Sequence, residues 1–167
     1  VQTVYKRNIN LPSGGNIVID STEALVSIDV NSARSTKGSD IEETALNTNI
    51  EAAVEILTQL KLRDIGGLVV IDFIDMMSIN SQKNVMRKVA EYAKKDKAKI
   101  QFARISKFGL MELSRQKLKS SIIQNNYENC PTCDGTGQIK SLSSLAISVL
   151  RIIEEEAINS KNKETVY

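Results

Sequence analysis

Two short runs decide the fold of this sequence: Ser27-Ile28-Asp29-Val30-Asn31-Ser32-Ala33-Arg34 and Leu68-Val69-Val70-Ile71-Asp72-Phe73-Ile74-Asp75. Both are rich in apolar and β-branched residues, which favours β-strands. Each run presents an aspartate, Asp29 or Asp72, at the point where a buried strand should reach solvent. An unpaired carboxylate inside an apolar strand costs several kcal/mol, so each aspartate needs a partner. A divalent metal ion is the partner that best suits two such carboxylates from separate strands.

The size and composition of the chain limit what it can be. Its 167 residues are enough for one main core with a small appendage. A hydrophobic fraction of 41% with 25% charged residues is typical of a soluble globular protein. No apolar run is long enough to span a bilayer, and no signal-peptide pattern opens the sequence. The net charge of +2 is too small to indicate nucleic-acid binding by itself, so phosphate contacts would need local basic clusters.

Two missing residue types restrict the chemistry. The sequence has no histidine, so proton transfer or metal binding must use carboxylates, amides, water, lysine or thiols. It has no tryptophan and only 4% aromatic residues, which argues against a platform for stacking bases. The chain also begins with Val1 rather than Met, so we expect it to be a segment of a longer protein.

The periodicity predicts an α/β fold, with a mixed β-sheet and flanking helices. Residues 24–30 alternate apolar and polar side chains, so Asp29 and Asn31 should share one face of a strand. A helix from Asp40 to about Lys61 and a strand at 68–74, buried on both faces, would complete a βαβ unit. Further strands are predicted at 1–10, 16–20 and 99–105, and helices at 79–96, 109–119 and 141–160. We expect a main domain at 1–126, a knuckle at 127–140 and the start of a small helical domain at 141–167.

The predicted site lies where the two central strands end. Asp29 and Asp72 are 43 residues apart, which is enough for one crossover helix, and ligands gather at the carboxyl ends of such strands. With the amide of Asn31 they form a hard oxygen set suited to magnesium or manganese. Arg34 and Lys37 in the following loop could hold a phosphate. In the alternative interpretation the aspartates pair with Arg or Lys, and Arg34 and Lys37 are solvated surface charges. Asp75 would face away from Asp72 in a regular strand.

The two cysteines, Cys130 and Cys133, have the spacing of a zinc knuckle. A closed zinc site needs four ligands, and this chain offers two thiolates and no imidazole. The pattern therefore predicts one zinc ion shared by two chains, which would also join them. A redox pair or two inert thiols are the alternatives. A redox pair normally opens a helix, whereas Gly135-Thr136-Gly137 follows here, which disfavours that interpretation.

Motifs along nearly the whole chain resemble one family. They are Leu11-Pro12-Ser13-Gly14-Gly15, Glu23-Ala24-Leu25 with Ile28 to Arg34, Asp40-Ile41-Glu42-Glu43-Thr44, Asn47-Thr48-Asn49, Gly66 to Met76, Phe108-Gly109-Leu110 with Glu112 and Ser114-Arg115-Gln116, and Cys130-Pro131 with Cys133, Gly135 and Gly137. Together they are similar to the ribonuclease E/G family. The set is far more specific than any single motif.

The resemblance implies a deoxyribonuclease-I-like catalytic subdomain followed by a zinc link. The family cuts single-stranded, A/U-rich RNA hydrolytically in RNA processing and mRNA decay, leaving a 5′-phosphate and a 3′-hydroxyl. Its magnesium ligands match Asp29 and Asp72, with the amide of Asn31 hydrogen-bonding nearby. Its zinc-link cysteines match Cys130 and Cys133, with one zinc ion per two chains. The intact enzyme of the family is a cytoplasmic tetramer, built as a dimer of dimers.

The sequence also departs from the family. Lys99 stands where an arginine is expected, at a position that helps to bind the 5′ end of RNA in relatives. The family's RNA-binding portions, including its 5′-phosphate sensor, precede this stretch. We therefore expect the segment to cut RNA poorly alone. Inner-membrane association and contacts with other RNA-decay proteins would use regions outside it. The alternative function is a non-catalytic RNA-binding and oligomerisation module held by an intersubunit zinc ion.

Overall fold

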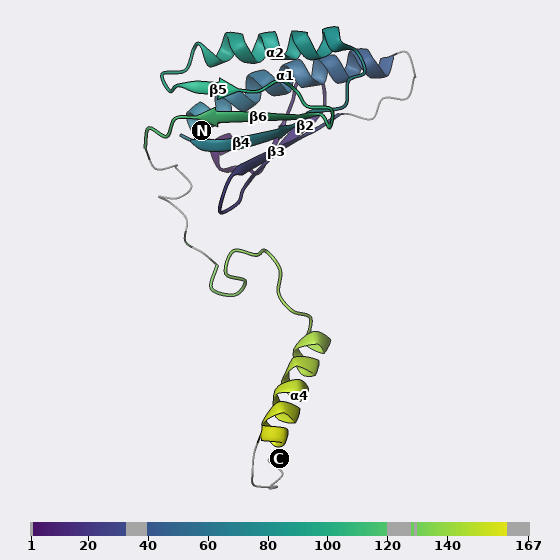
Figure 1. The fold of residues 1–167 in the computed structure, drawn as a ribbon, viewed down its shortest axis with the longest axis vertical. Helices are drawn as coiled ribbons and strands as arrows, with labels where there is room; N and C mark the ends of the chain where they lie inside the picture. The colour runs from purple at the N-terminus through teal and green to yellow at the C-terminus, as the bar shows by residue number, and fades with distance from the viewer. Residues whose placement is uncertain (1, 33–39, 120–127, 129, 160–167) are drawn as a thin grey trace. The chain divides into compact units, whose positions relative to one another are not determined.

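The computed structural model describes residues 2–32, 40–119, 128 and 130–159 (Figure 1). The chain divides into two compact units, residues 1–127 and 128–167, which are described separately. The first unit is a mixed β-sheet covered by helices, as the sequence predicts. Within the described residues, no helix combines the length and the apolar character needed to cross a membrane.

The sheet has six strands in the order β1-β2-β3-β4-β6-β5. Its strands are β1 (Asn8–Asn10), β2 (Asn16–Ser21), β3 (Val26–Asn31), β4 (Gly67–Asp72), β5 (Ile100–Phe102) and β6 (Leu110–Arg115). The central pair, β3 and β4, is parallel. The other neighbours are antiparallel, including β1 and β2, which form a hairpin. The helix between β3 and β4 makes this the predicted βαβ unit.

Two helices, α1 (Asp40–Leu62) and α2 (Ile79–Ala93), cover one face of the sheet (Figure 1). The inward residues of α1, which include Ala45, Ala52, Ile56 and Leu60, are buried, whereas Ile41 at its start is 56% exposed. The helices pack on the inward side chains of the central strands, and the buried core includes Ile28, Val30, Ala52, Ile56, Leu60, Val69, Ile71, Val85, Val89, Met111 and Leu113.

No helix among the described residues of this unit covers the other face of the sheet (Figure 1). In β4, Val69 and Ile71 are buried, whereas Leu68 is 47% exposed and Asp72 is exposed. The prediction that this strand is buried on both faces is wrong. Both helices lie on the same side, so the apolar run in β4 has one solvent-facing side.

The predicted basic helix at 109–119 is also wrong, because residues 110–115 form β6. Met111, Leu113 and Arg115 are buried and the residues between them are exposed, which is the period of a strand. Arg115 fits the inward face because buried acceptors receive its guanidinium. At the amino terminus, the predicted strand is replaced by a 3-10 helix, η1 (Gln2–Tyr5), before β1.

The second unit contains a turn-rich knuckle, which includes Cys130 and Cys133, and helix α4 (Leu142–Asn159). None of the residues of α4 is buried within the described structure. The predicted linker at 120–129 lies outside the described residues except for Glu128.

Arg115 is, with Arg63, one of two buried arginines among the described residues. Its side chain is 2% exposed and donates to Asp96 at 2.9 Å, to Asp64 at 3.3 Å and to the carbonyl of Ile65 at 2.9 Å. Arg115→Leu would leave these acceptors unpaired. We expect it to lower the free energy of unfolding by about 3–5 kcal/mol, measured by urea denaturation. Arg7→Leu, which breaks the exposed pair with Asp20, is the control and should change little. An equal loss in both variants would contradict this assignment.

The same network predicts a pH dependence. Burial raises the pKa of Asp96, but its hydrogen bond and charge interaction with Arg115 hold that pKa below its ordinary value. The stability that this pair contributes is therefore fully present above the unfolded pKa of about 3.9 and is lost as the pH falls further. Arg115→Leu should flatten this part of the stability curve. If the free energy of unfolding of that variant still falls as steeply in acid, other carboxylates cause the pH dependence.

Candidate functional site

The parallel pairing of β3 with β4 places Asp29 directly opposite Asp72. Adjacent strands lie about 4.8 Å apart, and both side chains are exposed on the sheet face that no helix of this unit covers. Ile28 and Ile71, the residues before them, are paired on the buried face. The core therefore fixes the register that brings the two carboxylates together.

Asn31 lies beside this pair, as the alternation in β3 predicts. Its Nδ2 donates to Asp29 Oδ2 at 2.9 Å and lies 3.4 Å from Asn16 Oδ1 on the neighbouring strand. The amide thus holds one carboxylate oxygen of Asp29 in place. In this arrangement Asn31 presents its N–H group, and not its oxygen, to the aspartate, which supports an orienting role for the side chain.

Asp75 also belongs to this group of carboxylates. The pKa of Asp72 is raised by burial, then by the charge of Asp29 and then by that of Asp75. The expectation that Asp75 faces away from Asp72 is wrong, because β4 ends at Asp72 and strand alternation does not continue to residue 75. The charges that shift Asp72 are negative. The ion pairs of the described residues join Arg7, Lys88, Lys95 and Arg115 to acidic groups other than Asp29 and Asp72.

Gly109 closes the site from the loop between β5 and β6. Its carbonyl accepts the N–H of Phe73 at 3.2 Å. A methyl group built on Gly109 would lie 3.1 Å from Asp75 Oδ1 and 3.8 Å from Asp72 Oδ1. Its φ of +77° also favours glycine. The absence of a side chain at this position therefore leaves room for the two carboxylates.

Helix α1 holds the loop that carries Asp75. Asn49, which is fully buried, donates to the carbonyl of Ile74 at 2.8 Å and accepts its N–H at 3.0 Å. Glu42 accepts the N–H groups of Met77 at 3.0 Å and Ser78 at 3.1 Å, and bonds from Met77, Ser81 and Ser78 lower its pKa. Sequence reasoning gave no role to Asn49 beyond its motif. The available signal was that Asn49 is a polar residue on the inward face of the predicted helix, where it needs a hydrogen-bond partner.

The predicted basic residues are not brought to this group by the described structure. Arg34 and Lys37 lie outside the described residues. Lys99 is exposed, and its carbonyl accepts the N–H of Gln116, beyond the end of β6 that pairs with Gly67. Gly67 and Asp72 are the two ends of β4, roughly 17 Å apart at about 3.3 Å per residue. Lys99 therefore lies at the opposite end of the sheet, and its RNA-binding role stays a prediction.

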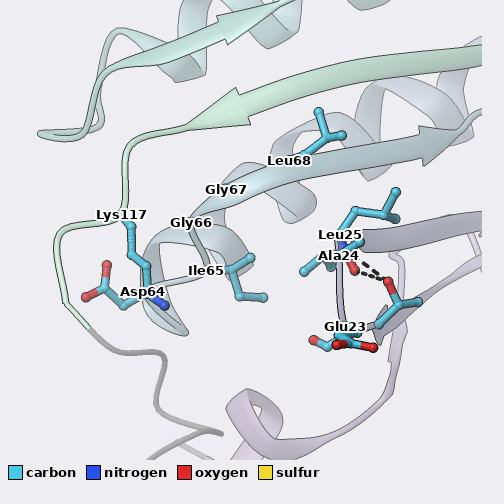
Figure 2. Close-up of a pocket in the computed structure, with 12 residues that line it drawn as sticks. Glu23, Ala24, Leu25, Asp64, Ile65, Gly66, Gly67, Leu68 and Lys117 are labelled. Atoms are coloured by element: carbon cyan, nitrogen blue, oxygen red, sulfur yellow. Dashed lines mark hydrogen bonds between the residues drawn. The ribbon is translucent and has the colours of Figure 1, made fainter.

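A hollow of about 180 Å³ lies at that opposite end. Figure 2 shows it between the turn at Glu23–Leu25 and the segment from Ile65 to Leu68, with Asp64 and Lys117 on another side. These residues precede β3, precede or begin β4, or follow β6, whereas Asp29 and Asp72 lie near the carboxyl ends of β3 and β4. The hollow is thus separate from the carboxylate group.

The donor set at the carboxylates fits magnesium. Magnesium prefers small, hard oxygen ligands. In proteins it is commonly bound by one or two carboxylates and keeps several of its water ligands. No three His, Cys, Asp or Glu side chains converge on a metal-binding point within the described part of the chain. Asp29 and Asp72 would therefore hold the ion as a pair. Asn31 would orient Asp29 through its hydrogen bond, and Asp75 would lie beside Asp72 without binding the ion.

The cysteine pair has the local structure of a thiolate site. Both thiols are free, and the N–H groups of Thr132 and Cys133 bond to the sulfur of Cys130 and lower its pKa. The N–H of Asp134 donates to the carbonyl of Cys130 at 2.8 Å, and Asp134 has a φ of 48°. A tight turn that stabilises thiolate is what a zinc ligand needs.

Comparisons with known proteins identify the family to which the chain is similar. The model of the ribonuclease E/G family matches residues 1–118, and a second model, the thioredoxin-like domain of RNase E/G, matches residues 129–167. The chain is 54% identical to ribonuclease E of Haemophilus influenzae and 53% identical to that of Escherichia coli, over 98% of its length in each case. It is 34% identical to ribonuclease G of Haemophilus influenzae over its full length.

The chain belongs to the ribonuclease E/G family. Its identity is higher to these ribonuclease E sequences than to the ribonuclease G sequence. It spans 18% of the Haemophilus ribonuclease E, 16% of the Escherichia one and 34% of the ribonuclease G.

Gly109→Ala tests whether this glycine shapes the carboxylate group. The new methyl group would crowd Asp75 and the carbonyl of Phe73 at 3.1 Å, so we expect magnesium affinity to fall about 10-fold or more, the scale of disturbing groups that orient a metal ligand. Gly67→Ala is the matched control, because Gly67 has a φ of +96° but nothing within 4 Å of the added carbon. Both variants should lose similar stability, and only Gly109→Ala should lose affinity in a calorimetric titration. Equal affinities would show that Gly109 does not shape the site.

Proposed function

We propose that this chain is the metal-dependent catalytic segment of an endoribonuclease that hydrolyses single-stranded RNA. The observation that carries the proposal is the register of Asp29 opposite Asp72 at the exposed end of a parallel strand pair. Membership of the ribonuclease E/G family supports RNA as the substrate. We further propose A/U-rich sites and products with a 5′-phosphate and a 3′-hydroxyl, in RNA processing and mRNA decay.

In this proposal Asp29 and Asp72 hold one magnesium ion. The ion, when bound, supplies positive charge that lowers the pKa of a water and stabilises charge on phosphodiester oxygens. Asn31 keeps Asp29 oriented through its 2.9 Å hydrogen bond. The raised pKa of Asp72 reflects burial and repulsion by Asp29 and then Asp75, which a bound cation would relieve. The loop anchored by Asn49 fixes Asp75 beside them. Arg34 and Lys37 are proposed to contact RNA phosphates next to this group.

We also propose that Cys130 and Cys133 bind one zinc ion together with the same pair of a second chain. The N–H groups that bond to the sulfur of Cys130 support the thiolate form that zinc requires. The exposed apolar residues of α4 support further contacts between chains, because they include Leu145, Ile152 and Ile153 with more than half of their surfaces exposed. A dimer of dimers is the proposed assembly.

The second candidate function is a non-catalytic module that binds RNA and assembles through zinc. The knuckle and α4 support it as well as they support the enzyme, since they form a unit of their own. The two functions differ only at the carboxylates. Asp29 and Asp72 decide between them, because a module that only binds RNA has no need for a metal-holding carboxylate pair.

Asp72→Asn is expected to reduce RNA cutting about 100-fold or more, because it removes a charged group that stabilises the reacting centre. Asp29→Asn should do the same. Cutting is measured on a single-stranded RNA with a hybrid enzyme, in which this chain replaces the matching segment of the Haemophilus ribonuclease E. The control is Glu112→Gln, which removes an exposed carboxylate from the neighbouring strand β6. The melting temperature and RNA affinity should stay close to those of the parent. If cutting persists in both aspartate variants, the catalytic proposal is wrong and the assembly module is favoured.

Cys130→Ser is expected to release the zinc ion shared by two chains. Zinc content should fall from about one per two chains to near zero, and the assembly should shift to smaller species in native mass spectrometry. Ser143→Ala, in α4 of the same unit, serves as the control. Full zinc content with full assembly in Cys130→Ser would show that the knuckle does not join the chains.

A further inference from the structure

The turn between β5 and β6 presents an aromatic ring to solvent. Phe108 is 82% exposed, the largest exposure of a described phenylalanine or tyrosine among the exposed apolar side chains. Its N–H donates to Ser106 Oγ at 3.2 Å, and the N–H groups of Ser106 and Gly109 bond within the same turn at 2.8 and 3.1 Å. The backbone below the ring is thus fixed by its own hydrogen bonds. A rigid turn loses little conformational entropy when its side chain binds a ligand.

The turn that carries Phe108 lies next to the carboxylate group. Phe108 directly precedes Gly109, the residue whose added methyl group would lie 3.1 Å from Asp75 Oδ1 and 3.8 Å from Asp72 Oδ1. The carbonyl of Gly109 accepts the N–H of Phe73, which follows Asp72. The turn and the strand end are therefore tied together by a backbone hydrogen bond.

The segments that follow β5 and β4 carry exposed basic and apolar side chains. Lys107, the neighbour of Phe108 in the turn, and Arg104 are exposed. Between β4 and α2, Met77 is 97% exposed, and Ile79, the first residue of α2, is 68% exposed. Single exposed apolar residues are common, but several at one end of a sheet beside basic residues mark an interaction surface. Bases, which are flat and apolar on their faces, and phosphates, which are negative, match this combination.

We propose that Phe108 is a stacking site for the base of a nucleotide adjacent to the phosphate that is cut, with Lys107 contacting the backbone. This inference rests on the proposed function, because it assumes that RNA reaches Asp29 and Asp72. Stacking on a ring tolerates different bases, since every base has a π face. The low aromatic content argues against a platform on which several bases stack. It is compatible with stacking of one base on the single ring of Phe108.

The test measures RNA affinity separately from cutting. The hybrid enzyme carries Asp72→Asn, and its binding to a short single-stranded RNA is followed by fluorescence anisotropy in magnesium. Phe108→Ala should weaken binding about 5- to 150-fold, the range for losing one base–aromatic stack. Phe108→Tyr should restore affinity because it keeps the ring. Tyr5→Ala, which removes a 46% exposed aromatic of η1, is the matched control and should bind like the parent.

A series of RNAs with one abasic nucleotide each identifies the stacked base. One position should cost the parent as much affinity as Phe108→Ala does, and the same RNA should bind Phe108→Ala no more weakly than the intact RNA. In the cutting-competent hybrid, Phe108→Ala should raise KM with little change in kcat. A uniform loss at every abasic position would overturn the stacking assignment. So would a changed assembly state of Phe108→Ala with unchanged RNA affinity, since that would make the ring a protein contact.

The outcomes separate this inference from the proposed function. If Phe108→Ala binds and cuts like the parent while Asp72→Asn abolishes cutting, stacking is wrong and the catalytic proposal stands. If the parent hybrid neither binds nor cuts single-stranded RNA, the proposed function fails and the stacking site fails with it. Melting temperatures within a few degrees of the parent would confirm that each variant is folded.

Discussion

The parallel pairing of β3 with β4 is the constraint on which the rest of the structure depends. A sheet presents successive side chains on opposite faces, so a slip of one residue would move Asp29 or Asp72 to the buried side. Ile28 and Ile71, paired one position earlier and almost fully buried, make such a slip expensive. Packing of α1 and α2 on these residues thus fixes the position of two charges on the other face. The packing of the core on one face of the sheet therefore determines where the two carboxylates lie on the opposite face.

The arrangement of the carboxylates has an electrostatic cost. Asp72 lies near Asp29 and Asp75, and both neighbours raise its pKa after burial does. The rest of the fold resists the separation that this repulsion favours: Asn49 binds the backbone of Ile74, and Gly109 leaves the space that a side chain would fill. Unfavourable contacts held in place by the surrounding structure are concentrated at functional sites. A divalent cation would convert the same repulsion into binding energy.

The sequence predicts the parts of the fold that follow from local periodicity. Alternation in β3 was enough to place Asp29 and Asn31 on one face, and the spacing to Asp72 was enough for a βαβ unit. The strand β6 was missed because Leu110, Met111 and Glu112 favour helix locally, whereas the strand is stabilised by pairing with β4 and β5 and by the distant partners of Arg115. Asp75 and Gly109 could not be assigned to the site because their proximity to Asp72 depends on tertiary contacts. No local sequence pattern indicates this proximity.

The two ends of the sheet are chemically different, and this bears on how RNA would bind. Asp29 and Asp72 lie at one end, whereas Lys99 and the hollow near Gly66 lie at the other, roughly 17 Å away along β4. Lys99 therefore cannot contact the phosphate that Asp72 would act on. If it contacts RNA, it does so several nucleotides away, along the open face of the sheet. An RNA end bound near Lys99 and the phosphate cut near Asp72 would then lie on the same face of the sheet, separated by about the length of β4.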